Sequence, residues 1–181
     1  MKKTYINNIE LKNGDYFLVH NYPFKHKFNP LAWLIQLFTR CYYHHCSIYF
    51  DGYIYEAVSS GFKQTHNIND FISDIGNLRE IALCREDILV SYNSIKKNLD
   101  TKYDFVGLLF QLWKQLFNTW IGGERTKKVT CSTILAKLFK RDKWWEYDPQ
   151  DLFRETVTNN KVIYVSNLKG QEKINTILNS I

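Results

Sequence analysis

Residues 45–57 read His45-Cys46-Ser47-Ile48-Tyr49-Phe50-Asp51-Gly52-Tyr53-Ile54-Tyr55-Glu56-Ala57, and this stretch decides the fold. Apolar residues alternate with other types on both sides of Asp51-Gly52, and that pair suits a two-residue type I′ turn. The stretch therefore predicts a β-hairpin, and its short turn fixes which residues lie opposite one another.

The predicted register places a histidine beside a carboxylate. With Phe50 opposite Tyr53, Ser47 lies opposite Glu56, and one face of the hairpin carries His45, Ser47, Tyr49, Ile54, Glu56 and Val58. His45 and Glu56 are then diagonal neighbours roughly 7 Å apart, within reach of each other's side chains. His44 points to the opposite face, so the register selects His45 as the histidine that a carboxylate can orient.

A second stretch supplies a candidate nucleophile. Residues 130–139 predict a helix, because Ile134, Leu135, Leu138 and Phe139 recur at helical spacing. Thr130 is suited to the N-cap and places Cys131 in the first turn. There the helix dipole and unpaired N–H groups favour the thiolate, and the same N–H groups can stabilise an oxyanion. Cys131, His45 and Glu56 are the parts of a cysteine-nucleophile site.

Simpler interpretations of these residues exist. A cysteine at a helix start is often just a small buried side chain, a strand histidine is often structural, and a hairpin glutamate is often solvated. A zinc site is a further alternative, because four potential ligands crowd one short segment: Cys41, His44, His45 and Cys46. No second ligand pair follows at zinc-finger spacing, so the metal signal is weak.

The chain also resembles a known family. The motifs are Gly14-Asp15-Tyr16-Phe17-Leu18, His45-Cys46-Ser47-Ile48-Tyr49, Tyr55-Glu56-Ala57, Tyr103-Asp104-Phe105, Cys131-Ser132 and Asp148-Pro149-Gln150-Asp151-Leu152. They resemble the papain-like NlpC-type superfamily, in the circularly permuted branch that includes YiiX-like bacterial proteins and lecithin:retinol acyltransferase-like enzymes. The specific feature is the order histidine, acid, cysteine, because unpermuted members have the cysteine first.

The resemblance implies a fold and an activity. The expected fold is α+β, a small antiparallel sheet packed with helices in one papain-like domain over residues 1–181. The expected activity is that of a cysteine peptidase or amidase, with Cys131 as nucleophile, His45 as base and Glu56 as orienting residue, acting on a peptide or peptidoglycan-like amide without metal or organic cofactor. A lipid-directed acyl transferase or esterase with the same site, and a non-catalytic binding module on this scaffold, are the alternatives.

The composition limits the class of protein and the compartment that we expect. The 181 residues are 45% hydrophobic and 16% aromatic, enough for one folded core. Four irregularly spaced cysteines and the lack of an export signal predict reduced thiols in the cytoplasm, unless lysis or a virion delivers the protein to a cell wall. The net charge of +6 comes without a recognised nucleic-acid-binding motif, so specific nucleic-acid binding is not expected. The oligomeric state stays open.

The rest of the chain predicts further elements. We expect strands over residues 15–20, 80–85 and 161–165 and helices over 31–38, 86–99 and the residues after Asp148-Pro149. In the predicted helix over 86–99 the residues expected to face inward are Ile88, Leu89, Tyr92, Ile95 and Leu99. Residues 61–74 are expected to be a connection with a short helical stretch at about 69–75.

The last expected element is a strongly apolar helix over residues 105–120, capped by Asp104, with Gln111, Lys114, Gln115 and Asn118 on a narrow polar face. We expect it to lie in the core; the alternative is that part of it covers a substrate groove, a partner or a lipid surface, with peripheral membrane contact.

The loop after this helix, residues 121–125, is a candidate lid. The candidate substrate-groove residues are Gly122, Gly123 and Arg125 of this loop, together with Ser47 and Tyr49 of the hairpin. Basic residues gather near Cys131 in the sequence: Arg125, Lys127, Lys128, Lys137, Lys140, Arg141 and Lys143. A solvated face is the expected interpretation, and attraction of an anionic substrate or membrane surface is the alternative.

Overall fold

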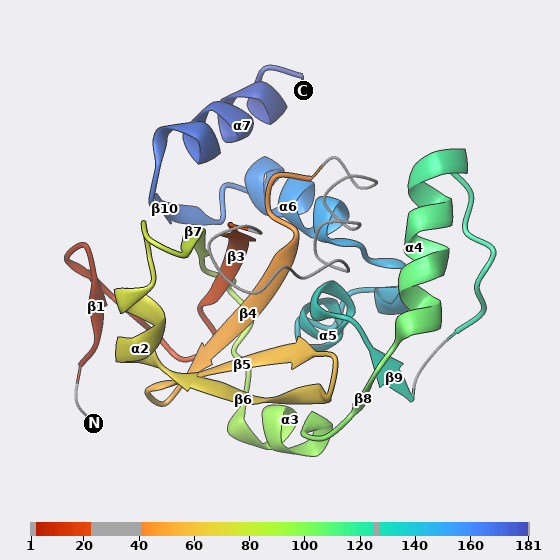
Figure 1. Cartoon of the computed structure of the whole chain (residues 1–181), viewed down its shortest axis with the longest axis horizontal. Helices are drawn as coiled ribbons and strands as arrows, with labels where there is room; N and C mark the ends of the chain where they lie inside the picture. The colour runs from red at the N-terminus through yellow and green to blue at the C-terminus, as the bar shows by residue number, and fades with distance from the viewer. Residues whose placement is uncertain (1–2, 23–40, 125–126, 181) are drawn as a thin grey trace.

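The protein has an α+β fold built on a six-stranded antiparallel sheet (Figure 1). The structure is a computed structural model and describes residues 3–22, 41–124 and 127–180. In spatial order the sheet runs β10 (Val162–Val165), β7 (Arg79–Cys84), β3 (Tyr16–Asn21), β4 (His45–Phe50), β5 (Tyr53–Val58) and β6 (Gly61–Asn67). Two small pairs add β1 (Tyr5–Ile6) with β2 (Ile9–Glu10), and β8 (Lys102–Tyr103) with β9 (Lys128–Val129).

Helices surround this sheet. They are α2 (Ile68–Ser73), α3 (Tyr92–Asn98), α4 (Phe105–Phe117), α5 (Cys131–Leu138), α6 (Pro149–Thr158) and α7 (Leu168–Leu178), with a 3₁₀ turn η1 (Trp144–Glu146) before α6. α5 packs against β4 and β5, while α2 packs against β5 and β6. Within the described ranges, no helix combines the length and apolar character needed to cross a membrane.

The hairpin of β4 and β5 has the predicted register. Ser47 lies opposite Glu56, and Phe50 lies opposite Tyr53. At the turn Asp51 and Gly52 both have positive φ, 48° and 85°, as a type I′ turn requires. The prediction of a hairpin with this register is therefore confirmed.

The two faces of the sheet bury different clusters, as the alternation predicts. Cys46, Ile48 and Tyr55 belong to the larger core cluster, which they share with the apolar side of α5. Tyr49 and Ile54 belong to the second cluster, together with residues of α2. Burying an aliphatic or aromatic side chain contributes about 1.5–3 kcal/mol. The larger cluster therefore holds α5 firmly against the hairpin.

Two predictions about the middle of the chain are wrong. Residues 61–67 are not a connection but strand β6, an edge strand paired with β5. Its polar residues hide the strand pattern, and an edge strand tolerates them because one side faces solvent. The helix expected over 86–99 is shortened to α3, because Ser91 caps it by accepting a bond from the Ser94 N–H. Leu89, expected to face inward, is 92% exposed.

The strands expected at residues 15–20, 80–85 and 161–165 appear as β3, β7 and β10. Asp148 caps α6 through a capping box with Asp151, so the helix after Asp148-Pro149 is also confirmed. The helix expected over 31–38 lies outside the described residues.

The strongly apolar helix exists, but the face expected to be buried is exposed. Asp104 caps α4 as predicted, accepting a bond from the Gly107 N–H. Gln111, predicted on the polar face, is 1% exposed, whereas Leu109 and Leu116 are 60% and 57% exposed. The expectation that α4 lies in the core is therefore wrong for most of its apolar face. The polar side chains find partners on α6 and the segment before it, and those partners fix the orientation of the helix.

Candidate active site

Cys131 is the first residue of α5, at a helix start that its neighbours fix tightly. Thr130 is the N-cap: its backbone N–H donates to Thr133 Oγ1 at 2.7 Å, and the Thr133 N–H donates to Thr130 Oγ1 at 3.4 Å. This reciprocal capping box confirms the predicted N-cap. It leaves the N–H groups of Cys131 and Ser132 at the positive end of the helix, where intrahelical acceptors are missing.

The start of β4 places a histidine against this cysteine. His45 is the first residue of the strand, and its ring hydrogen-bonds the Cys131 thiol. Its Nε2 also lies 3.4 Å from Glu56 Oε1. Glu56 is buried, and the His45 side chain is 19% exposed. The structure thus brings together the three residues that the sequence selected.

A fourth residue holds the carboxylate. Thr65 Oγ1 donates to Glu56 Oε2 at 2.9 Å, so each carboxylate oxygen has a partner. The β5–β6 register shifts at this point: Ile54 pairs with His66 and Tyr55 with Gln64, which leaves Thr65 as the extra residue. Such an irregularity re-aims a side chain. The sequence reasoning missed Thr65 because it did not recognise β6.

Electrostatics favour an ion pair between cysteine and histidine. The hydrogen bond from the Cys46 thiol, and the hydrogen bond and charge of His45, hold the pKa of Cys131 well below its ordinary value despite burial. Burial alone would lower the pKa of His45, but hydrogen bonds to Cys131 and Glu56 and their negative charge raise it to about 10. Burial likewise opposes ionisation of Glu56, yet the bond and charge of His45 lower its pKa. A thiolate facing an imidazolium follows.

Cys46 is a further member of the site that sequence reasoning did not select. Its thiol hydrogen-bonds Cys131, and this bond, followed by burial, raises the pKa of Cys46 well above its ordinary value. Its backbone N–H also hydrogen-bonds the Cys131 thiolate. Alternation places Cys46 on the opposite face from His45, but α5 packs on that face and its first residue reaches the end of the strand. Cys46 is therefore a proton-holding donor to the candidate nucleophile.

The candidate groove residues lie at several places. Ser47 is buried opposite Glu56, and its Oγ has no hydrogen-bond partner within the described ranges. Tyr49 packs in the second core cluster. A Cβ on Gly122 would meet Phe110 and Trp120, so this glycine lies against the side of α4, while Gly123 has open space beside it. Arg125 lies outside the described residues. A role in substrate contact stays a prediction for all five.

The residues considered for zinc are engaged elsewhere. Cys41 Sγ donates to the Tyr43 carbonyl at 2.9 Å, and the His44 ring lies edge-on to His20 with 5.5 Å between centroids. Burial, with His45 and His20 nearby, lowers the pKa of His44 to about 3, so its ring is neutral. In the part of the chain that the structure describes, no three His, Cys, Asp or Glu side chains are grouped as metal ligands.

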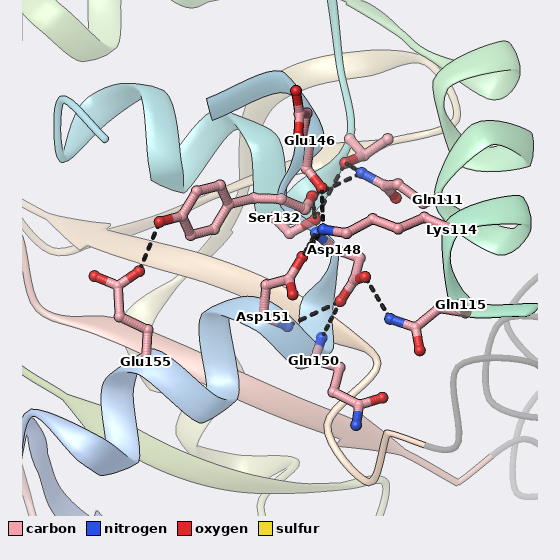
Figure 2. A network of polar contacts seen from close by, with 11 residues as sticks. Gln111, Lys114, Gln115, Ser132, Glu146, Asp148, Gln150, Asp151 and Glu155 are labelled. Carbon is pink, nitrogen blue, oxygen red and sulfur yellow. Dashed lines mark hydrogen bonds and ion pairs between the residues drawn. The ribbon is translucent and has the colours of Figure 1, made fainter. Parts of the chain in front are cut away.

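A buried polar network joins the helix start of α5 to α4 (Figure 2). Gln111 Nε2 donates to Thr130 Oγ1 at 3.2 Å and to the Tyr147 carbonyl at 2.7 Å, and Ser132 Oγ donates to the same carbonyl at 2.8 Å. Because Thr130 and Ser132 flank Cys131, this network fixes the backbone on both sides of the candidate nucleophile.

The network continues to the start of α6. Lys114 Nζ donates to Asp151 Oδ2 at 2.6 Å, and Gln115 Nε2 donates to Asp148 Oδ2. Burial and the neighbouring Asp151 carboxylate raise the pKa of Asp148 to about 6. Three polar side chains of α4, at positions 111, 114 and 115, therefore attach the helix to the segment from Glu146 to Asp151 (Figure 2).

The arrangement of Cys131, His45 and Glu56 is suited to nucleophilic catalysis. It combines a thiolate at a helix start, an imidazolium that can return a proton and a carboxylate held by a hydroxyl. Comparison of the sequence with models of known families and with curated proteins gives no match.

Proposed function

We propose that this chain is a cysteine-dependent hydrolase that cleaves an amide bond, in a peptide or peptidoglycan-like substrate, through a thioester acyl-enzyme. The observation that carries the proposal is the contact of Cys131 with His45, which in turn lies 3.4 Å from Glu56. The order of these residues along the chain also supports membership of the permuted papain-like NlpC-type superfamily.

The proposed reaction starts from the ion pair. The Cys131 thiolate attacks the amide carbonyl, a carbon–sulfur bond forms, and the carbonyl oxygen becomes an oxyanion. We expect the Cys131 and Ser132 N–H groups, which the capping box leaves without intrahelical acceptors, to receive that oxyanion. Glu56 occupies Nε2 of His45, so Nδ1 is the nitrogen that donates a proton to the leaving amine as the carbon–nitrogen bond breaks.

Hydrolysis of the thioester completes the cycle. Neutral His45 takes a proton from water, the resulting hydroxide attacks the acyl carbon, and the carboxylic acid leaves as the thiolate returns. Residues of the chain supply every proton-transfer group in this scheme. All four cysteines are free thiols, which supports placing the reaction in a reducing compartment such as the cytoplasm.

A second substrate class has its own support. The exposed apolar face of α4 favours a lipid ester or acyl amide, with a lipid acceptor resolving the same thioester. A purely binding role is the less favoured alternative, because a depressed thiol pKa has no use in a binding module.

The test is turnover of amide and ester libraries by wild type and two cysteine variants. Cys131→Ala should lose turnover by at least about a thousandfold while thermal unfolding changes little. Cys84→Ala is the matched control, since Cys84 is equally buried but sits in β7 with a pKa raised by burial. Full activity of Cys131→Ala, or equal loss in both variants, would refute the proposal.

A further inference from the structure

One face of α4 is apolar and exposed. The exposed fractions of its side chains lie between 41% and 60%, and the residues recur at three- and four-residue spacing. They are Phe105, Val106, Leu109, Trp113, Leu116 and Phe117. We call this set the α4 apolar face. Residues at that spacing form one continuous stripe, and in most globular proteins such a stripe faces the core. Here the stripe is exposed instead.

The helix presents this face rigidly. Its opposite side is held by Gln111, Lys114 and Gln115, whose side chains point from α4 toward α5 and α6 (Figure 2). Asp104 caps one end, and Asn118 ends the other in the left-handed conformation with its N–H on the Lys114 carbonyl at 2.7 Å. In Figure 1, α4 lies beyond α5 as seen from the sheet, and the loop that follows α4 runs along its outer side. A preformed helix loses little entropy on binding.

A cationic hollow adjoins the start of this helix. It has a volume of about 610 Å³ and is lined by five lysines with one acid among its lining residues, Asp100. The lysines are Lys97, Lys102, Lys127, Lys137 and Lys140, and we call the hollow that they line the lysine hollow. None of the five forms an ion pair within the described ranges. Burial, followed by repulsion from Lys97, lowers the pKa of Lys137, so the lysines of this hollow are close enough to repel one another.

The chain joins the two features. Lys102 lies in β8, three residues before Phe105 begins α4, and β8 pairs with β9 through Lys102 and Lys128. An excess of positive charge therefore borders the end of the helix at which the apolar face starts. Exposed Phe, Leu and Trp beside a group of lysines is the pattern of a helix that lies in a membrane interface.

We propose that the α4 apolar face and the lysine hollow together dock the protein on an anionic phospholipid surface. The apolar side chains enter the boundary between headgroups and acyl chains, where Trp113 is suited to the amphipathic interface. The lysines bind lipid phosphates, whose negative charge balances the excess of lysines over acids in the described lining of the hollow. A helix of 13 residues is about 20 Å long, too short to cross a bilayer core of about 30 Å, so it lies in the plane of the surface.

The experiment is co-sedimentation of the full chain with vesicles of phosphatidylcholine alone and with matched vesicles containing about a third phosphatidylserine. We expect clear binding to the anionic vesicles and at least tenfold weaker binding to the neutral ones. Leu109→Ser/Leu116→Ser and Lys102→Ala/Lys127→Ala should each weaken anionic binding by about tenfold or more. Leu89→Ser/Leu168→Ser is the matched control, because these leucines are 92% and 83% exposed but lie outside α4; it should bind like wild type.

Several outcomes would overturn the proposal. They are absence of binding to anionic vesicles, equal binding by wild type and the Leu109→Ser/Leu116→Ser variant, and loss of binding in the lysine variant alone, which would indicate a simple polyanion site. A further contradicting outcome is that wild type is a dimer in sedimentation velocity and binds no vesicles, while the Leu109→Ser/Leu116→Ser variant is a monomer. A second copy of the chain would then cover the α4 apolar face. Docking does not rest on the proposed chemistry: Cys131→Ala should bind like wild type, so the two proposals fail separately.

Discussion

Thr65→Val isolates the support that the structure gives to Glu56. Valine keeps the shape of threonine but lacks the hydroxyl that donates to Glu56 Oε2 at 2.9 Å. A hydrogen bond to a charged group contributes about 1.5–3 kcal/mol, and this acceptor is buried, so its loss is not compensated by water. We therefore expect the free energy of unfolding at pH 7 to fall by about 1.5–3 kcal/mol.

The effect should depend on pH with a definite sign. Burial raises the pKa of Glu56, but the bond and charge of His45 and the bond from Thr65 outweigh it and hold the pKa below 4.5. A carboxyl whose pKa is lower in the folded state adds stability above its unfolded pKa and loses it as the pH falls through the folded value. The cost of Thr65→Val should therefore be largest near neutral pH and shrink below about pH 4.

Urea unfolding followed by tryptophan fluorescence, at pH 7 and at about pH 3.5, measures both values. Thr158→Val is the control: Thr158 Oγ1 is exposed and donates to a backbone carbonyl, so its loss should cost under about 0.5 kcal/mol at either pH. An equal cost of Thr65→Val at both pH values, or a cost no larger than that of the control, would refute the role given to Thr65.

Three further predictions concern the surroundings of the site. Cys46→Ala removes the thiol donor and should raise the apparent pKa of Cys131 by about one unit or more in an alkylation profile, whereas Cys84→Ala should not. Asp148 has a folded pKa of about 6, above its ordinary 3.8, so the cost of its buried charge is relieved as the pH falls. In urea unfolding, the free energy of wild type relative to that of Asp148→Asn should therefore rise by about 1–2 kcal/mol between pH 7.5 and 5. Leu109→Ser/Leu116→Ser should change the melting temperature by no more than a few degrees, because both leucines are more than half exposed; a large loss would show that the α4 apolar face is buried in solution.

The hairpin and the capped cysteine helix were predictable because their signals are local. Asp51-Gly52 dictates the turn, the turn fixes the register, and the register pairs Ser47 with Glu56. Thr130 and Thr133 form a capping box within four residues. From these short-range rules the sequence identifies Cys131, His45 and Glu56, which the structure brings into contact.

The features that we did not predict from the sequence depend on contacts between residues far apart in the chain. A 3.6-residue pattern shows that apolar residues share a face of α4, but Gln111 and Lys114 meet partners more than thirty residues away, and these determine which face is buried. Thr65 is aimed at Glu56 by a register shift between two strands, which has no sequence signal of its own. Cys46 reaches Cys131 because a helix packs across the strand end.

The measurement that tests the central claim most directly is the pH dependence of iodoacetamide alkylation, mapped to each cysteine by mass spectrometry, for wild type and His45→Ala. Because Cys131 has a depressed pKa and the other three cysteines have raised ones, Cys131 alone should react near neutral pH. Its apparent pKa should lie well below about 8.5, and His45→Ala should raise it. A Cys131 that is inert, or that titrates like a free thiol in both proteins, would contradict the thiolate–imidazolium pair and the chemistry built on it.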